Sequence, residues 1–486
     1  MEVIFPDIDA YRGWAHPSRT ESTIEGLELV EGHLPAGLNG TWYRCGADRQ
    51  YPPMDGEDIF IDGEGMMFMI RFDDGHVSFR NRWVHTPRFE LQARHRRSLF
   101  GRYRNRYTAD PLAADTSPGT ANTNMLFHAG KLYALKEDDL PYEVDPDTLE
   151  TLRQSDLDGQ VSAVSLTAHH KVDWVTGELL TYSYQAKGDS TTDFAIYIFD
   201  ADGKKVNEVW FDAPWPGVVH DFAVTEEHIV VPFFPLVTPS IEGLKEGRHF
   251  YEYHPDKPTM VAVVPRYGKA EDVRWFEGPN TTAGHMLNAV TEGTPEGTKV
   301  HLDLCLYNGN CFPFFPAPDG SVHPAVPPIL TRMTFDLARN DRGYETRPII
   351  PVPCEMPRTD DRWQGRDYTH GWVIVYRATD GSSTLGHVNV RTGALDVWEH
   401  GQMISVQEPQ FVPRAPDSRE GDGWILSILN RLDKGHSEIA VFDALDMAKG
   451  PIARLHLPVR VRSSFHGVWV PEEVFETGRY AMEAVA

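Results

Sequence analysis

Cysteine is scarce in this sequence of 486 residues. The four cysteines are Cys45, Cys305, Cys311 and Cys354, and no two of them form a C-x-x-C pair. The sequence therefore contains neither a zinc ribbon nor a dithiol redox motif. Four cysteines in so long a protein do not build a disulfide framework, and this usage is typical of a protein in a reducing compartment.

Long apolar runs and an excess of positive charge are also missing. The most apolar stretch, 229–237, is interrupted by Pro232 and Pro235 and is far shorter than the ~20 residues of a membrane helix. The first fourteen residues lack the basic start of a secretory signal. The net charge of -25 disfavours nucleic acid and anionic membrane surfaces as partners. We therefore expect a cytoplasmic protein with no nucleic-acid partner and no stable membrane insertion.

Turn signals, in contrast, are dense, because Asp-Gly pairs favour tight hairpins. Such pairs stand at 55–56, 62–63, 74–75, 158–159, 202–203, 319–320, 380–381 and 422–423. Many are flanked by β-rich runs, as at 67–72 with 77–84 and at 195–199 with 205–211. Helical signals are weak and local, at 86–100, 236–247 and 443–449. The pattern predicts an all-β fold of many short strands, which leaves a sandwich, a barrel and a propeller open.

The chain shows no strict repeat and no Ser- or Pro-rich linker, so we expect one domain over 1–486. The longest irregular region, 311–328, is rich in Pro and Phe. Loops of this length in a compact domain are more often functional than not.

Four histidines share a setting of small or apolar neighbours. An alternating strand expected at 164–168 leads into His169 and His170, and only one of two adjacent strand residues faces a given side. The others are His220, His285 and His466, in VVHDF, AGHML and SFHGV. Their separations of 51, 65 and 181 residues fit ligands from separate structural units, not a local clip. The pattern leaves two interpretations open, a four-histidine metal site and buried structural histidines.

A metal-bound imidazole usually donates its second N–H to a carboxylate. Glu137, Glu408 and Glu438 stand in apolar or strand-like contexts and are candidates for this role. The alternative for each is a glutamate at a strand end on the surface.

Several motifs together resemble the carotenoid cleavage oxygenase family. They are TAHHK (167–171), VVHDFAVTE (218–226), GHMLNAVTEG (284–293), QEPQFVPR (407–414), GDGWILSIL (421–429), FHGVW (465–469), GLELVEGHLPAGLNGTWYRCG (26–46) and FIDGEGM (60–66). The resemblance spans about 24–470 and leaves a C-terminal tail at 471–486. It implies a seven-bladed β-propeller with a loop-and-helix dome, and Fe(II) as cofactor with O2 as co-substrate.

The resemblance also implies roles for individual residues. The iron ligands would be His169, His220, His285 and His466. Glu137 would support His220, Glu408 would support His285 and Glu438 would support His466.

Other segments resemble the bacterial branch of this family that acts on lignostilbenes and isoeugenol. They are SLFGRYRNRYTADP (98–111), ANTNMLFHAGKLYALKEDDLPYEVDP (121–146) and DVRWFEGP (272–279). The Tyr and Lys that hold the substrate phenol in that branch map onto Tyr103 and Lys136. Phe312 and Phe315 in CFPFFP resemble the stilbene type, whereas Ile61 stands where stilbene-cleaving relatives often have Phe.

The predicted function is a non-haem Fe(II) dioxygenase of aromatic catabolism. It would act on a small 4-hydroxyphenyl alkene and cleave its double bond, either between two phenyl rings or in an alkenyl substituent, into aromatic aldehydes. Cleavage of isoeugenol, a vinylphenol or an apocarotenoid at the same iron site stays open, as does a homodimer. A non-catalytic propeller that serves as a binding module and a propeller glycosidase with two carboxylates are the competing classes.

Overall fold

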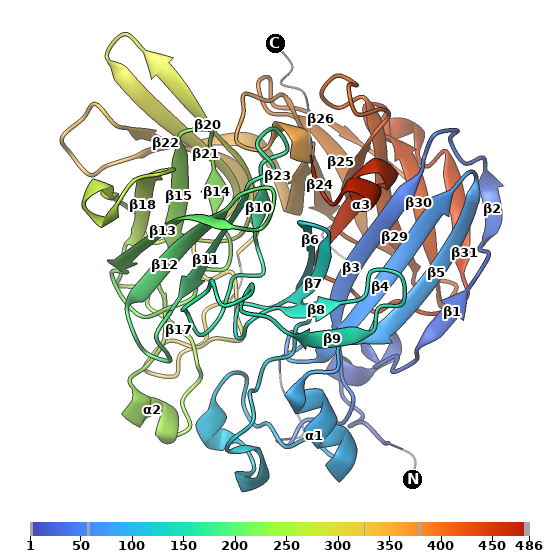
Figure 1. Cartoon of the computed structure of the whole chain (residues 1–486), viewed down its shortest axis with the longest axis horizontal. Coiled ribbons are helices and arrows are strands. Elements are labelled where there is room, and N and C mark those ends of the chain that lie inside the picture. The colour runs from blue at the N-terminus through green and yellow to red at the C-terminus, as the bar shows by residue number, and fades with distance from the viewer. Residues whose placement is uncertain (1–2, 56–58, 325, 378–380, 481–486) are drawn as a thin grey trace.

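The computed structural model describes residues 3–55, 59–324, 326–377 and 381–480. Short antiparallel sheets are arranged side by side around a common centre (Figure 1). Six sheets contain four or more strands, and the seven-stranded one comprises two blades. The reason is β23 (Glu345–Thr359), which pairs with β22 through its first half and with β24 through its second half. The chain is thus a seven-bladed β-propeller, as expected.

Five of the blades are built from strands that lie near one another along the sequence. The first three blades are β6 (Asn124–His128), β7 (Lys131–Leu135), β8 (Tyr142–Val144) and β9 (Thr151–Gln154); β10 (Lys171–Val172), β11 (Leu179–Tyr184), β12 (Asp193–Phe199) and β13 (Lys205–Asp212); and β14 (Ala223–Val224), β15 (His228–Phe233), β18 (Thr259–Pro265) and β19 (Arg274–Gly278). The next two are β20 (Thr282–Thr294), β21 (Gly297–Tyr307), β22 (Ile329–Asp336) and β23; and β23, β24 (His370–Tyr376), β25 (Ser383–Asn389) and β26 (Ala394–Val397).

The last two blades combine strands from the two ends of the sequence. They are β27 (Ile404–Val406), β28 (Gln410–Pro413), β29 (Gly423–Arg431), β30 (His436–Asp443), β31 (Ala453–Leu457) and β2 (Glu28–Gly32); and β32 (Gly467–Pro471), β3 (Gly40–Asp48), β4 (Glu64–Asp73), β5 (His76–Trp83) and β1 (Ser22–Ile24). The blue and red strands therefore lie side by side in Figure 1. These two pairings, β2 with β31 and β3 with β32, close the ring.

Two of the predicted Asp-Gly turns, 74–75 and 202–203, join paired strands, whereas the pairs at 158–159 and 319–320 lie in longer loops. Asp74 and Gly75 join β4 to β5, and both have positive φ, at 43° and 80°. Two consecutive residues of positive φ are what a two-residue hairpin turn requires, and Asp-Gly supplies them at low cost. The pairs at 55–56 and 380–381 include residues outside the described ranges, as does the part of the tail at 481–486.

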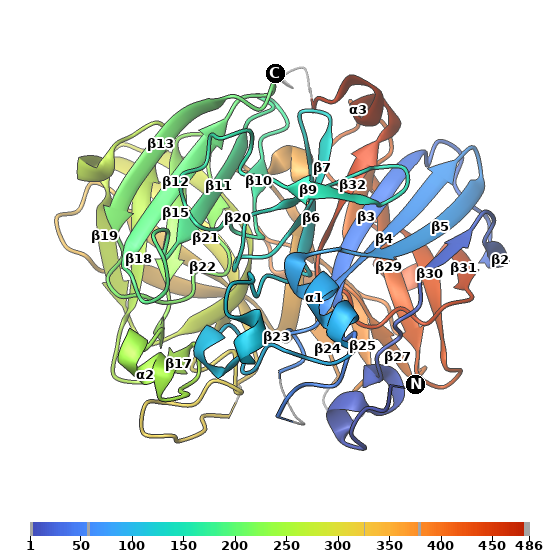
Figure 2. The ribbon, with the colours of Figure 1, turned by 60° about the horizontal axis from the view of Figure 1, so that its bottom comes forward.

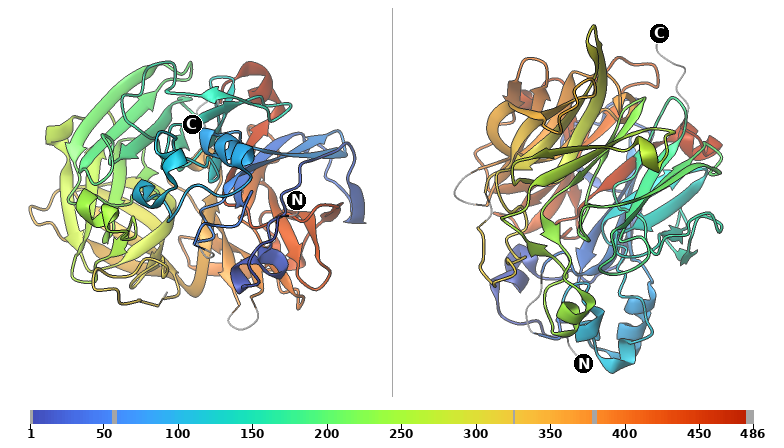
Figure 3. Two further views of the ribbon diagram at one scale, coloured as in Figure 1. Left: turned by 90° about the horizontal axis from the view of Figure 1, so that it is seen from below. Right: turned by 90° about the vertical axis from the view of Figure 1, so that its left-hand side faces the viewer.

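Helices and long loops gather on one side of the propeller. They include α1 (Pro87–His95), α2 (Ile241–Lys245) and the short 3-10 turns Arg106–Thr108 and Pro111–Ala113, with the loop between β21 and β22. Figure 2 and the right-hand view of Figure 3 show α1 and α2 projecting from the same side. Thr86 begins α1, since its side chain accepts a hydrogen bond from the Phe89 N–H. This layer is the dome.

Two of the predicted helices are α-helical but shorter than expected, and the third is a 3-10 turn at Met447–Lys449. The strand expected at 164–168 is wrong. Its N–H groups donate to carbonyls of separate segments, Leu166 to Asp139 and Thr167 to Tyr182, so no ladder forms. No helix in the described part of the protein is long and apolar enough to cross a membrane.

Large aromatic side chains fill the space between neighbouring blades. Trp372 on β24 has no exposed surface and stacks on Phe411 of β28, with ring centroids 4.9 Å apart. Its indole N–H donates to the Ala444 carbonyl at 2.8 Å, so the polar atom is satisfied in the core. The contact between Trp372 and Phe411 packs the blade that contains β24 against the blade that contains β28.

Candidate metal centre and substrate cavity

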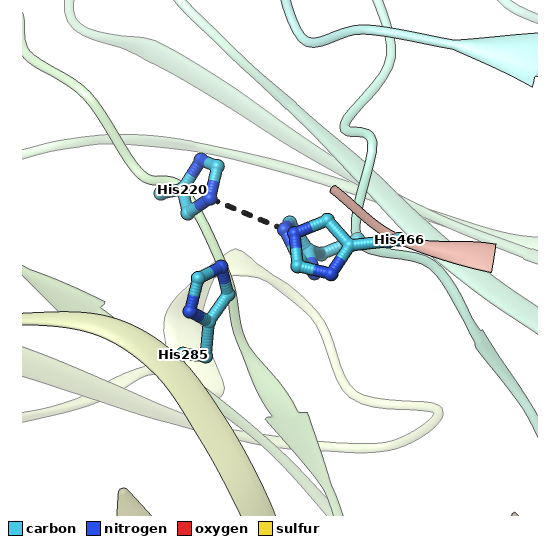
Figure 4. A group of neighbouring side chains, drawn as sticks. His220, His285 and His466 are labelled. Carbon is cyan, nitrogen blue, oxygen red and sulfur yellow. Dashed lines mark hydrogen bonds between the residues drawn. The ribbon is translucent and has the colours of Figure 1, made fainter. Parts of the chain in front are cut away.

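The four predicted histidines lie at the first strands of four different blades. His169 stands two residues before β10, His220 three before β14, and His466 directly before β32, while His285 lies within β20. The first strands of neighbouring blades contact one another, as β32 does β6 and β28. The side chains of His220, His285 and His466 converge on a common point (Figure 4). The propeller thus brings together residues that are far apart in the sequence.

A break in strand pairing directs His285 toward the centre. Ala283 pairs with Leu306 and Met286 pairs with Leu304, so Gly284 and His285 together face one residue of β21. This is a β-bulge, which turns a side chain out of the regular alternation. A similar irregularity follows Glu355 on β23, where Met356 has a φ of 51°. The two bulges bring His285 and Glu355 into contact.

The four imidazoles have the spacing of ligands around one ion. Their ligand nitrogens all lie within 4.8 Å of one another, and the Nε2 atoms of His169 and His220 are 3.2 Å apart. With metal–nitrogen bonds of about 2.1 Å, adjacent ligand nitrogens stand about 3.0 Å apart and opposite ones about 4.2 Å. The 3.2 Å separation lies within this range, and the 4.8 Å limit on the cluster is slightly wider than it.

Three of the histidines have a glutamate at the opposite ring nitrogen. The Nδ1 atom lies 2.8 Å from Glu355 in His285, 2.8 Å from Glu408 in His466, and 3.5 Å from Glu137 in His220. The Nδ1 of His169 is 3.7 Å from Asp221. A carboxylate at Nδ1 places the proton there and leaves Nε2 as the free donor.

The electrostatics favour neutral imidazoles at His169 and His466 and ionised carboxylates at Glu408 and Glu137. At His285, in contrast, burial lowers the pKa but the contact with Glu355 outweighs it, so the pKa is raised. Burial, aided by the other three rings, lowers the pKa of His169 well below its usual value. Burial also lowers the pKa of His466, to about 4. For Glu408, burial opposes ionisation, but His466 and Arg358 outweigh it and hold the pKa at about 2. The pKa of Glu137 is likewise about 2, because its contact with His220 outweighs burial.

One buried nitrogen of the cluster lacks a hydrogen-bond partner. The Nε2 of His285 is buried and has no hydrogen-bond partner among the described residues. An orphaned buried polar atom is costly unless a ligand satisfies it. A metal ion at the centre of the four rings would do so.

Two of the expected glutamate partners are wrong. Glu408 lies beside His466, not His285, because it precedes β28 in the blade next to β32. Glu438 is in the middle of its blade on β30, where it accepts hydrogen bonds from Arg431 at 3.2 Å and His436 at 2.9 Å. The partner of His285 is Glu355, which sequence reasoning missed. Its segment, PVPCEMPR, has three prolines and reads as a loop, although Glu before Met-Pro parallels Glu408 before Pro409.

An apolar cavity of ≈ 140 Å³ lies against the cluster and includes His220, His285 and His466 in its wall. Its other lining residues are Phe60, Ile61, Tyr103, Thr123, Lys136, Glu137, Val218, Tyr251, Phe312, Phe315, Met356 and Phe465. All predicted pocket residues therefore lie here, and Phe60, Tyr251, Met356 and Phe465 are additions. Phe465 could have been found from its place beside His466.

Lys136 brings a charged group into this apolar wall. Its side chain is only 2% exposed, and its Nζ donates to the Thr120 hydroxyl at 3.0 Å and to the Ile61 carbonyl at 3.3 Å. It also lies 4.9 Å from the centre of the Tyr103 ring. Burial raises the pKa of Tyr103 well above 10, so this phenol stays a hydrogen-bond donor. Tyr103 packs in turn on Phe315, with centroids 6.1 Å apart.

A sequence model of the retinal pigment epithelial membrane protein family matches residues 15–471. The chain belongs to this family, the carotenoid cleavage oxygenases. It is 38% identical over 483 residues to lignostilbene-alpha,beta-dioxygenase isozyme III of Sphingomonas paucimobilis, with 96% of this chain and 97% of that protein covered. It is 37% identical over 470 residues to isoeugenol monooxygenase of Pseudomonas nitroreducens, with coverage of 94% and 96%.

Solved structures agree with these relatives. The crystal structure of Pseudomonas brassicacearum lignostilbene dioxygenase superposes with a TM-score of 0.93 at 44% identity, covering 97% of this chain and 100% of that one. The Synechocystis apocarotenoid oxygenase superposes with a TM-score of 0.80 at 23% identity, covering 93% and 96%. The second likeness concerns the fold alone.

Proposed function

We propose that this protein is an Fe(II)-dependent dioxygenase that cleaves the C=C bond of a 4-hydroxyphenyl alkene with O2, giving two carbonyl fragments of which at least one is an aromatic aldehyde. One observation carries the proposal: three of the four clustered imidazoles and a buried Lys136–Tyr103 pair share the wall of a single apolar cavity. The names of the relatives, a lignostilbene dioxygenase and an isoeugenol monooxygenase, support the same class of substrate.

His169, His220, His285 and His466 would hold the iron. Imidazole suits iron among other transition metals, and four neutral ligands leave Fe(II) its full charge and open positions for small molecules. The orphaned Nε2 of His285 supports a ligand at this place. When bound, Fe(II) supplies the redox chemistry through which O2 reacts with an alkene. The protein's own residues must place the alkene and make it electron-rich.

Lys136 and Tyr103 would make the alkene electron-rich. Ionisation of a phenol with pKa ≈ 10 at neutral pH costs about 4 kcal/mol. An ammonium in a water-poor pocket offsets much of this cost, because charge interactions are strong there. A phenolate conjugated to the alkene raises the electron density at the double bond. Tyr103, which keeps its proton, would donate a hydrogen bond that fixes the ring.

The competing classes fit the cavity less well. A glycosidase needs two carboxylates that flank the scissile bond. Glu137 is the single carboxylate among the described residues that line the cavity, and His220 already engages it. A non-catalytic binding module gives no reason to place four imidazole nitrogens within 4.8 Å of one another. An apocarotenoid has no phenol for Lys136 to ionise.

The decisive experiment is aerobic incubation of the Fe(II)-loaded protein with a 4-hydroxystilbene, isoeugenol, a vinylphenol and an apocarotenoid, followed by product identification by mass. We expect aromatic aldehydes from the hydroxylated substrates. The 4-methoxy analogue of the stilbene should resist cleavage. Equal cleavage of the methyl ether would overturn phenol activation and favour the apocarotenoid route.

Metal-free protein should be inactive and should recover with Fe(II). We further propose that the protein works in a reducing cytoplasm, since its four cysteines are unbridged.

A further inference from the structure

A second hollow lies next to the substrate cavity, on the far side of the turn that carries Lys136. This cleft of ≈ 620 Å³ is lined by Arg104, Asp138, Asp139, Tyr184 and Asp189, among others. Arg106, Tyr107, Asp115 and Lys187 at its rim are exposed, so the cleft opens to solvent. Neither Lys136 nor the four histidines line it. Lys136 therefore lines the substrate cavity but not the neighbouring cleft.

The turn over residues 136–139 separates the two spaces. It is closed by a hydrogen bond from the Asp139 N–H to the Lys136 carbonyl at 3.3 Å. Three consecutive side chains then diverge: Lys136 lines the substrate cavity, Glu137 reaches toward His220, and Asp138 lines the cleft. The Nζ of Lys136 and Oδ2 of Asp138 stand 3.5 Å apart. The ion pair of Lys136 and Asp138 therefore spans the turn between the cavity and the cleft.

Asp138 is a carboxylate in an unusual position. Its side chain is only 4% exposed, yet its Oδ1 is buried and has no hydrogen-bond partner among the described residues. Buried carboxylates without hydrogen bonds are costly and rarely retained for structure alone. Its other oxygen, Oδ2, is the one that faces the Lys136 Nζ at 3.5 Å. The other charged or titratable groups near it are Arg104, Asp139, Tyr103, Tyr142 and Tyr251.

We propose that Asp138 carries the phenol proton from Lys136 to the solvent of the cleft. This inference rests on the proposed function, because it supplies the exit for the proton that phenol activation releases. An ammonium on Lys136 stabilises a phenolate but cannot take up another proton, so the phenol proton needs a second acceptor.

The steps balance without any oxidant or reductant. Lys136 gives one ammonium proton to an oxygen of Asp138 and takes the phenol proton in its place. One N–H bond and the phenol O–H bond break, while a new N–H bond and the Asp138 O–H bond form. The products are a phenolate beside an ammonium and a neutral Asp138, which then releases its proton to water in the cleft. Asp138 acts through Lys136 and does not touch the substrate.

The test compares Asp138→Asn with Asp189→Asn. Asp189 lines the same cleft and pairs with Arg106 at 3.2 Å, so the control removes a carboxylate from the same wall away from Lys136. Each Fe(II)-loaded protein is mixed without O2 with a 4-hydroxystilbene in a stopped-flow instrument, and the phenolate absorbance is followed. We expect Asp138→Asn to slow its appearance by ~100-fold or more, as for the loss of a positioned proton acceptor. Added formate, a small carboxylate that can enter the cleft, should restore part of the rate.

A purely structural counter-ion gives a different result. Removing the negative charge beside Lys136 would then stabilise the bound phenolate and leave its rate of formation unchanged, with no effect of formate. That outcome overturns the relay. If Asp138→Asn does not fold, as judged by thermal melting, Asp138→Ser allows the same comparison and leaves more room for formate.

Failure of the relay and failure of the proposed function are distinguishable. If the wild type forms no phenolate and cleaves the 4-methoxy analogue as fast as the phenol, phenol activation itself is wrong. If the wild type forms phenolate and Asp138→Asn does so equally fast, only the relay is wrong.

Discussion

Replacing Glu355 by Gln gives the sharpest test of how the propeller tunes its metal centre. The Oε2 of Glu355 accepts from His285 Nδ1 at 2.8 Å and from the Met356 N–H at 2.6 Å, while Oε1 accepts from the Tyr307 hydroxyl at 3.1 Å. A glutamine can keep this geometry. Its amide oxygen takes the place of Oε2, and its NH2 group donates to the Tyr307 hydroxyl, which rotates to accept. The substitution therefore removes charge without removing shape.

The magnitude follows from the role of that charge. The glutamate raises the basicity of His285 as a ligand and fixes its tautomer, and loss of such a partner costs about 10- to 100-fold in metal affinity. At 1.36 kcal/mol per factor of ten, this is about 1.4–2.7 kcal/mol of binding free energy. The thermal midpoint of the metal-free protein should change little, because the buried hydrogen bonds are retained.

The assay is competition for Fe(II) with a chelator of known affinity, under anaerobic conditions. Glu438→Gln is the matched control, since Glu438 is equally buried but contacts Arg431, His436 and Arg454 and no histidine of the cluster. We expect weaker iron binding in the Glu355 variant alone. Equal iron affinity in the wild type and Glu355→Gln would refute the reasoning that the carboxylate tunes the ligand.

Four further changes test other parts of the structure. His220→Ala should lose most of its iron by elemental analysis, whereas His170→Ala, beside the cluster but not part of it, should keep it. Tyr103→Phe should retain iron and lower kcat/KM for a 4-hydroxystilbene by less than Lys136→Met does; equal loss would make Tyr103 an essential partner. Gly284→Ala should weaken iron binding, because a Cβ there would stand 2.6 Å from the Glu355 Oε1 and displace it. Trp372→Ala should destabilise the fold by about 3–5 kcal/mol in a denaturant titration, as for buried tryptophans generally; a loss below about 1 kcal/mol would show that the blades repack around the gap.

The sequence predicts the class of fold because hairpin turns are local. Asp74-Gly75 needs only its own backbone to specify a turn, and the runs on either side need only their alternation to specify strands. The number of blades came from family resemblance, since no repeat marks it. The strand expected before His169 was wrong because its hydrogen-bond partners, Asp139 and Tyr182, belong to two different segments.

The sequence pattern does not predict which glutamate contacts which histidine. Glu438 lies in a clear strand that is buried on both faces, but a strand pattern does not tell which layer of a blade that strand occupies. Glu355 lies on the bulge of β23, and its orientation depends on a bulge that no residue pattern announced. Which carboxylate meets which imidazole is decided by contacts between blades, and these are long-range.

The closure of the ring also determines when, during synthesis, the four histidines can come together. His466 directly precedes β32, the strand that pairs with β3 from the other end of the sequence. A ribosome delivers His169, His220 and His285 long before it delivers His466. Until the last strand docks, the nascent protein lacks both its final blade pairing and its fourth imidazole. A metal ion that arrives earlier would meet only three of the four imidazoles. A protein truncated before His466 would lack both the pairing that closes the ring and one histidine of the cluster.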